Sequence, residues 1–257
     1  MKSKRQILRI ANWSITTVVV LYLALMLQPT LLFANHIEYR QCSIHSDKPI
    51  DKNITAVIDD ALLRISKSEI YDTKLHFNIY ICNSLWRFFV FAQGNMNAGA
   101  VTHYHLTGNI FLRPCDIANN QIVRPDKWKN SPHPFSFSDR PLSYYFAHEM
   151  THKLEANYMG AFDFSKPTWL IEGYADYIGK DGNFDFEENL RLLHASAPEL
   201  NPTLGLYRNY HLKVAYLLDK KQWRVEQLFA NAPDEKLLTE EILRLNYESK
   251  NNSVRKL

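Results

Sequence analysis

The chain has 257 residues, of which 46% are hydrophobic and 22% charged; this composition excludes a disordered or low-complexity chain and leaves enough length for one core. The formal net charge is +3, but four basic residues within the first nine positions account for more than that excess, so the rest of the chain carries −1. A body so close to neutral is not expected to bind nucleic acid.

Residues 1–34 have the pattern of a signal anchor or a signal peptide. A flank without acidic residues holds four basic ones: Lys2, Lys4, Arg5 and Arg9. The apolar run 15–34 is long enough to span a bilayer with some tilt, while its first part, 15–27, has the length of a signal-peptide core. A cut after Ala34 would place the bulky Leu32 where cleavage prefers a small residue, and this favours an uncleaved anchor.

The basic flank also predicts an orientation. By the positive-inside rule the N-terminus stays in the cytoplasm and the chain after residue 34 is exported, either as a single-pass membrane protein or as a secreted or periplasmic one. A buried helix of a soluble protein is a third interpretation, which the one-sided basic flank disfavours.

The first part of the exported chain predicts a small sheet with helices. Apolar residues recur at helical spacing within 50–70, alternate in the manner of a half-buried strand over 75–82, and follow a cap signal into a short helix over 86–91. Residues 100–104 and 110–112 are expected to pair as a hairpin around Thr107-Gly108-Asn109.

The three cysteines lack the C-x-x-C spacing of a zinc knuckle. In an oxidising compartment one disulfide can form, and we favour Cys82 with Cys115, because the strands that end near these residues can be neighbours in the sheet.

The second part of the chain predicts helices. Residues 116–141, with four prolines and several Asn, Asp and Ser residues, are expected to form an irregular connection. Beyond it, helical patterns occupy 142–159, 168–179, 187–194, 204–220 and 235–245. Strands followed by helices indicate an α+β fold, and no linker divides residues 35–257 into two domains.

The chemistry is concentrated in the first of these helices. His148, Glu149 and His152 form an H-E-x-x-H motif, and two histidines four residues apart on a helix can bind one zinc ion from the same face. Glu149 is turned by about 100° from His148 and is expected to point at the water held by the metal.

A third metal ligand is expected from the next helix. Glu172 lies in the sequence W-L-I-E-G-Y-A-D-Y and is separated from His152 by nineteen residues, a spacing that allows the chain to turn and bring it past the metal. Asp176, four residues further, lies on the same face, where it can accept a hydrogen bond from the far nitrogen of a ligand histidine.

Together the two motifs resemble those of the gluzincins, the thermolysin-like superfamily of zinc metallopeptidases. The resemblance implies a zincin-like α+β domain over residues 35–257, with a small twisted sheet whose edge strand lines the cleft and a helical C-terminal half. It implies His148, His152 and Glu172 as zinc ligands, Glu149 as general base and Asp176 as the supporting carboxylate. The implied substrate is a peptide or protein, hydrolysed by metal-activated water.

The same superfamily usually supplies an oxyanion donor, a Tyr or His, from a later helix. Its counterpart here is sought among four residues of 204–220, of which Tyr210 is favoured: Tyr207, Tyr210, His211 and Tyr216.

Two further choices stay open at this level. The loop 94–99 resembles the G-x-M-E-N motif of gluzincin aminopeptidases but has no acid where that motif holds the substrate amine, so an endopeptidase is favoured. The alternatives to an enzyme are an inactive, membrane-tethered module that binds zinc and peptides, and an envelope protein whose zinc only holds helices together.

Overall fold

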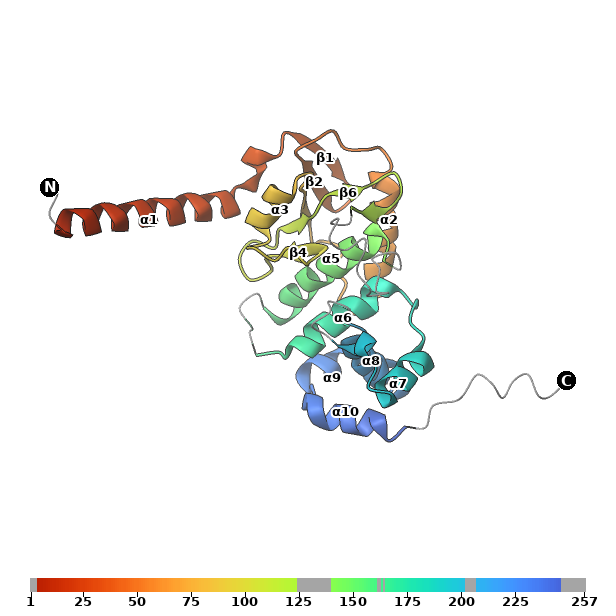
Figure 1. Cartoon of the computed structure of the whole chain (residues 1–257). Helices are drawn as coiled ribbons and strands as arrows, with labels where there is room; N and C mark the ends of the chain where they lie inside the picture. The colour runs from red at the N-terminus through yellow and green to blue at the C-terminus, as the bar shows by residue number, and fades with distance from the viewer. Residues whose placement is uncertain (1–3, 124–139, 161–162, 164, 202–206, 246–257) are drawn as a thin grey trace.

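The computed structural model describes every residue except 1–3, 124–139, 161–162, 164, 202–206 and 246–257, and it has the expected α+β architecture (Figure 1). The strands are β1 (Asn35–Tyr39), β2 (Cys42–Ser46), β3 (Phe77–Ile81), β4 (Ala100–Thr102), β5 (Ile110–Leu112), β6 (Cys115–Asp116) and β7 (Gln121–Ile122). The α-helices are α1 (Lys4–Leu27), α2 (Ile54–Ile65), α3 (Leu85–Phe91), α5 (Leu142–Met159), α6 (Thr168–Lys180), α7 (Phe186–His194), α8 (Arg208–Ala215), α9 (Val225–Ala230) and α10 (Glu235–Leu243). Short helical turns add η1 (Pro29–Leu32), η3 (Pro198–Leu200) and η5 (Tyr216–Lys220).

The main sheet is mixed, with the strand order β1-β2-β3-β5-β4. β2, β3 and β5 run parallel, whereas β1 and β4 pair antiparallel with their neighbours. A parallel pair needs a crossover connection, and α2 supplies the one between β2 and β3. β4 pairs with β5 as the predicted hairpin and forms one edge of this sheet.

Several boundaries differ from the sequence prediction. Neither β1 nor β2 was expected. α2 begins at Ile54, and Asp51 caps the turn before the helix by accepting a hydrogen bond from the Asn53 amide. The predicted helix 204–220 begins outside the described residues, and its described part divides into α8 and the π-helical segment η5. β6 and β7 form a second, two-stranded sheet within the predicted irregular connection.

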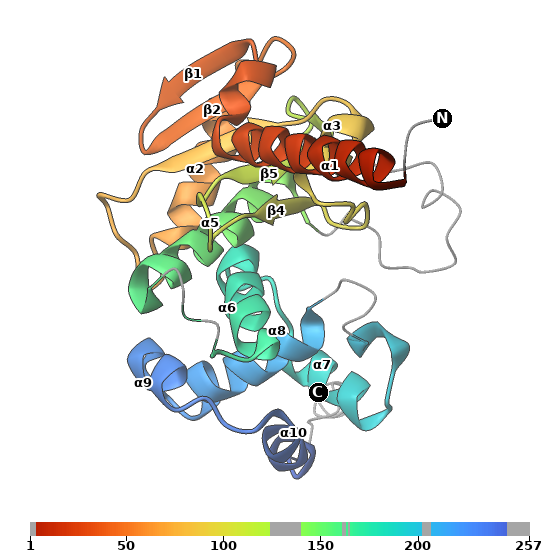
Figure 2. The same ribbon diagram turned by 90° about the vertical axis from the view of Figure 1, so that its left-hand side faces the viewer.

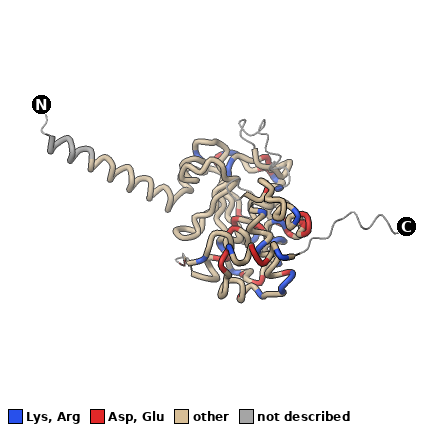
Figure 3. Tube along the Cα trace, turned by 60° about the horizontal axis from the view of Figure 1, so that its bottom comes forward, with Lys and Arg blue, Asp and Glu red and all other residues tan. Residues whose placement is uncertain are grey.

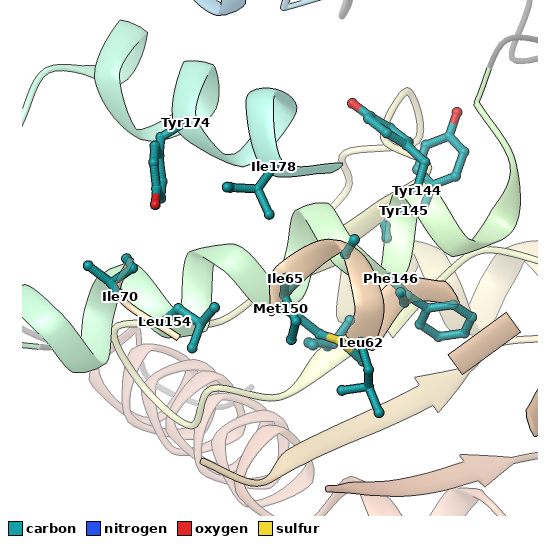
Figure 4. Packing of buried hydrophobic residues seen from close by; sticks show 14 of the residues in the cluster. Leu62, Ile65, Ile70, Tyr144, Tyr145, Phe146, Met150, Leu154, Tyr174 and Ile178 are labelled. Carbon is teal, nitrogen blue, oxygen red and sulfur yellow. The ribbon is translucent and has the colours of Figure 1, made fainter. Parts of the chain in front are cut away.

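Helix α5 crosses the centre of the molecule. Pro141 precedes its first turn, and Gly160 ends it with a φ of +98°, a conformation that strongly favours glycine. On one side α5 packs against α2 and the sheet, and on the other against α6. Figure 4 shows the apolar layer between them, in which Met150 and Leu154 of α5 meet residues of α2 and the segment after it, while Tyr174 points down from α6. The helix that carries the motif is therefore held from both faces.

Helix α1 projects from the body, and only its C-terminal end contacts it (Figures 1 and 2). The Tyr22 hydroxyl donates a hydrogen bond of 3.0 Å to the Val90 carbonyl of α3, and Met26 is buried in a cluster with Phe33 and Phe91. The described side chains of α1 carry no charge, in contrast to the body (Figure 3). Within the described part of the chain, none of the helices combines the length and the apolar character that crossing a membrane requires.

The expected disulfide is not formed, because all three cysteines are free thiols. The amide of Cys82 bonds to the carbonyl of Leu112, so β3 and β5 are neighbours as expected, but Cys115 lies further along the chain, where it begins β6. Burial raises the pKa of the Cys115 thiol to about 12, which makes it a poor nucleophile.

Candidate metal centre

Three side chains from α5 and α6 converge on one point. His148 and His152 lie one turn apart on α5, both 5% exposed, with their rings edge to face at a centroid distance of 4.8 Å. Glu172 of α6 faces them: its Oε2 lies 3.3 Å from His148 Nε2 and 3.6 Å from His152 Nε2. The three ligand atoms lie within 4.8 Å of one another, so this group can hold a metal ion.

The hydrogen bonding of the group also fits a metal. Glu172 Oε2 is buried and has no hydrogen-bond partner among the described residues. A buried carboxylate oxygen without a hydrogen bond is costly, and a cation between it and the two imidazoles satisfies all three atoms. The two histidines are close enough to hold the pKa of Glu172 well below its usual range, against the opposing effect of burial.

A neighbouring carboxylate orients one of the histidines. Glu155, on the next turn of α5 and 1% exposed, receives a 2.9 Å hydrogen bond from His152 Nδ1, which leaves Nε2 of the ring to face Glu172. Burial alone would lower the pKa of His152, but Glu172 and Glu155 hold it well above its ordinary value. The sequence analysis missed Glu155, although its spacing of three residues from His152 on a helix was a usable signal.

Asp176, which the sequence analysis assigned to this orienting role, binds other partners. Its Oδ1 accepts a 2.5 Å hydrogen bond from the Tyr144 hydroxyl, and its Oδ2 lies 2.9 Å from His211 Nδ1 and 3.2 Å from Lys180 Nζ. Asp176 is fully buried, and Lys180 leads the cations that hold its pKa well below the usual range despite burial. Since these contacts occupy both oxygens, Asp176 ties α5, α6 and α8 together.

Glu149 lies beside the metal group, outside its three ligands. Thr102, the last residue of the edge strand β4, donates one 2.6 Å hydrogen bond to Glu149 Oε2 and lies 3.1 Å from the Glu149 carbonyl. Glu149 is only 6% exposed, so this hydroxyl sets the direction of its carboxylate. Thr102 was not predicted, because nothing in the sequence links it to a residue 47 positions away.

Among the four candidate oxyanion donors, Tyr207 is the one in contact with a metal-site histidine. Its ring stacks on His148 at 5.6 Å with an interplanar angle of 8°. Burial, followed by the charges of Glu172 and Glu149, raises the pKa of Tyr207 far above its usual value, so its hydroxyl stays protonated.

The other three candidates lie elsewhere. The ring of the favoured Tyr210 stacks on that of Tyr207 at a centroid distance of 6.1 Å, and Lys213 Nζ lies over the Tyr210 ring. His211 binds Asp176, and the Tyr216 hydroxyl donates to Glu241 at 2.9 Å.

The sequence was also compared with known proteins. No protein-family model matches it, and none of the curated proteins compared with it matches either.

Proposed function

We propose that this chain is a zinc-dependent peptidase of the gluzincin type, acting on peptides or proteins. The observation that carries the proposal is the convergence of His148, His152 and Glu172, with a buried carboxylate, Glu149, beside them but outside the ligand set. Two imidazoles and one carboxylate form the ligand set of catalytic zinc sites, which keep a position open for water. A structural zinc site would instead use a fourth protein ligand.

The residues around the group have separable roles in this proposal. Bound zinc would supply a Lewis acid that polarises the scissile carbonyl and lowers the pKa of a water molecule. Glu149, aimed by Thr102, takes the proton of that water and delivers it to the leaving amine. Glu155 keeps the His152 ring in the orientation that presents Nε2. The protonated hydroxyl of Tyr207 donates to the oxyanion, the role that the sequence assigns to Tyr210.

The proposed substrate binds along the edge of the sheet. β4 is an edge strand, so the backbone N–H and C=O groups on its outer side have no partner strand in the main sheet. Its last residue, Thr102, contacts Glu149. An extended peptide added to this edge would pass beside the proposed catalytic residues. The absence of an acid in the loop 94–99 favours an endopeptidase over an aminopeptidase.

For residues 1–34 we propose the export role, as a signal anchor that keeps the N-terminus in the cytoplasm or as a cleaved signal peptide. A reporter fused after Leu257 separates this topology from its opposite, and a mature N-terminus near His36 identifies cleavage. Activity of the reporter in the cytoplasm alone would contradict export.

The decisive experiment compares the wild-type chain with Glu149→Gln. Both proteins are expected to bind about one zinc per chain, while digestion of an unfolded protein falls by about two to four orders of magnitude in the variant, because Gln cannot accept the proton. His148→Ala is the control that should lose the zinc. Equal digestion by both proteins would refute the role of Glu149, and zinc binding without digestion by either would favour the inactive peptide-binding module.

A further inference from the structure

A cavity of about 140 Å³ lies directly beside the proposed metal centre. Its walls come from the C-terminal turns of α5, the first turn of α6 and the segment that follows β4. Three of its lining residues connect it to the centre. Glu155 binds His152, the Tyr104 ring stacks on the same histidine at 5.7 Å, and Ile171 directly precedes Glu172. A group that enters the cavity is therefore next to the reacting bond.

One polar atom of the cavity lacks a partner. Glu155 is 1% exposed, and whereas its Oε2 binds His152, its Oε1 has no hydrogen-bond partner among the described residues. A buried carboxylate oxygen in this state costs stability unless a donor reaches it. The cavity is the space from which such a donor can come.

The remaining lining determines the chemistry of the donor. Met159 and Ile171 provide apolar walls, and two further charges, Asp163 and Lys166, oppose each other. Hydrogen bonds from Ser165 lower the pKa of Asp163, and Lys166 lowers it further. Since Lys166 is balanced by Asp163, Glu155 Oε1 is the acceptor that the described lining leaves without a donor, and the cavity favours a hydrogen-bond donor on an apolar stem.

We propose that this cavity is a specificity pocket for a basic side chain of the substrate, lysine or arginine, whose charged end binds Glu155 Oε1. The proposal rests on the proposed peptidase function. A water molecule occupies about 30 Å³ in the liquid, so the cavity has room for about five groups of that size, and a lysine side chain has as many non-hydrogen atoms. The methylene groups lie along the apolar walls while the ammonium group supplies the missing donor.

The test uses peptides that are identical except for one position near the cleaved bond, which holds lysine, norleucine or glutamate. Norleucine keeps the stem of lysine without its charge. The zinc-loaded full chain is expected to cleave the lysine peptide with a kcat/KM about 10- to 100-fold above that of the norleucine peptide, the range of a charge-assisted hydrogen bond. Glu155→Gln keeps an oxygen for His152 but removes the charge, so this ratio should fall to about one even if overall activity drops.

Two further variants keep the result interpretable. Asp163→Asn lowers the negative charge of the cavity without touching a metal-site histidine, and a partial loss of the ratio is expected even if Glu155→Gln fails to fold. Glu226→Gln makes the same change as Glu155→Gln on the exposed face of α9 and should leave the ratio unchanged.

The outcomes separate the pocket from the peptidase function. Equal cleavage of the lysine and norleucine peptides overturns the pocket and leaves the peptidase standing. If no peptide is cleaved, the peptidase proposal fails, and calorimetric binding of the same peptides to the full chain decides on the pocket. Tighter binding of the lysine peptide that is lost in Glu155→Gln supports it, whereas equal binding of both peptides overturns it.

Discussion

Two tyrosines of neighbouring turns differ in what they contact, and this difference predicts different effects of the same substitution. The Tyr207 ring stacks on His148, whereas the Tyr210 ring stacks on Tyr207. Tyr207→Phe keeps the ring stack but removes the proposed oxyanion donor, so kcat should fall by about 100- to 1,000-fold. Tyr210→Phe should change kcat little. The kcat of peptide hydrolysis is measured for both variants at equal zinc content. A larger loss of kcat in Tyr210→Phe would assign the oxyanion donor to Tyr210 instead.

Substitution of the two buried carboxylates near the metal centre, Glu155 and Asp176, should also have different effects. Glu155→Ala removes the acceptor for His152 Nδ1 and should weaken zinc binding by about 10- to 100-fold. Asp176→Asn instead removes the carboxylate that faces the Lys180 ammonium group in the interior, and should lower the free energy of unfolding by about 3 kcal/mol or more. Competition with a zinc chelator and denaturant unfolding give the two quantities. A larger loss of zinc affinity in Asp176→Asn would restore the role predicted from the sequence.

For single residues, the sequence predicts the three metal ligands better than the residues that orient the site around them. His148, His152 and Glu172 follow from helical spacing and from the length of chain between two helices, both of which are local properties. Thr102 and the partners of Asp176 depend on which elements become neighbours, and no spacing rule supplies that information.

Among the elements, α6 and α8 approach each other through a glycine. A Cβ at Gly173 would lie 2.6 Å from the carbonyl oxygen of Tyr210, a backbone atom that cannot turn aside. Gly173→Ala should therefore push α8, and Tyr207 with it, away from the metal group, at a cost of about 1 to 3 kcal/mol. The rate of peptide hydrolysis and the melting temperature should both fall.

The matched control is Gly179→Ala in the same helix, whose Cβ would meet the Tyr144 ring at 3.1 Å. A side chain can shift where a backbone cannot, so this variant should lose less. Equal losses in the two variants would show that the effect belongs to helix α6 itself and not to its contact with α8.

The helices were easier to predict than the strands. Helix α5 has the predicted bounds because Pro141 and Gly160 are strong local signals at its two ends. β2 was missed because it is buried on almost its whole length and so lacks the alternation of a half-exposed strand. β1 was missed because Ile37 and Tyr39 are its only apolar residues. The spacing of apolar residues over 204–220 does not indicate where the chain divides into α8 and η5.

The stability of the whole molecule should depend on pH through His211. Burial lowers the pKa of this side chain below its ordinary value of 6.5, although Asp176 acts in the opposite direction. Between the two values the unfolded chain binds the proton and the folded chain does not, so stability falls as the pH is lowered through this range.

We therefore expect His211 to contribute a loss of up to about 1.4 kcal/mol in the free energy of unfolding per pH unit below 6.5. His211→Gln keeps a donor for Asp176 without a titrating group and should lack this part of the slope. Denaturant unfolding of both proteins at pH 7.5, 6.5 and 5.5 measures the difference, in which the contributions of the other histidines cancel. Parallel curves would show that His211 titrates normally.

The attachment of α1 to the body has a mechanical consequence. The C-terminal end of α1 is fixed by the bond from Tyr22 to Val90 and by the burial of Met26 and Phe33, so residues 28–34 do not form a loose tether. The helix is therefore rigidly attached to the body. Whatever binds α1 also sets the orientation of the face that carries His148. Because these contacts join residues 22–33 directly to the body, a flexible Gly-Ser insertion after Ala34 would let the body turn freely only in a variant that also lacks them.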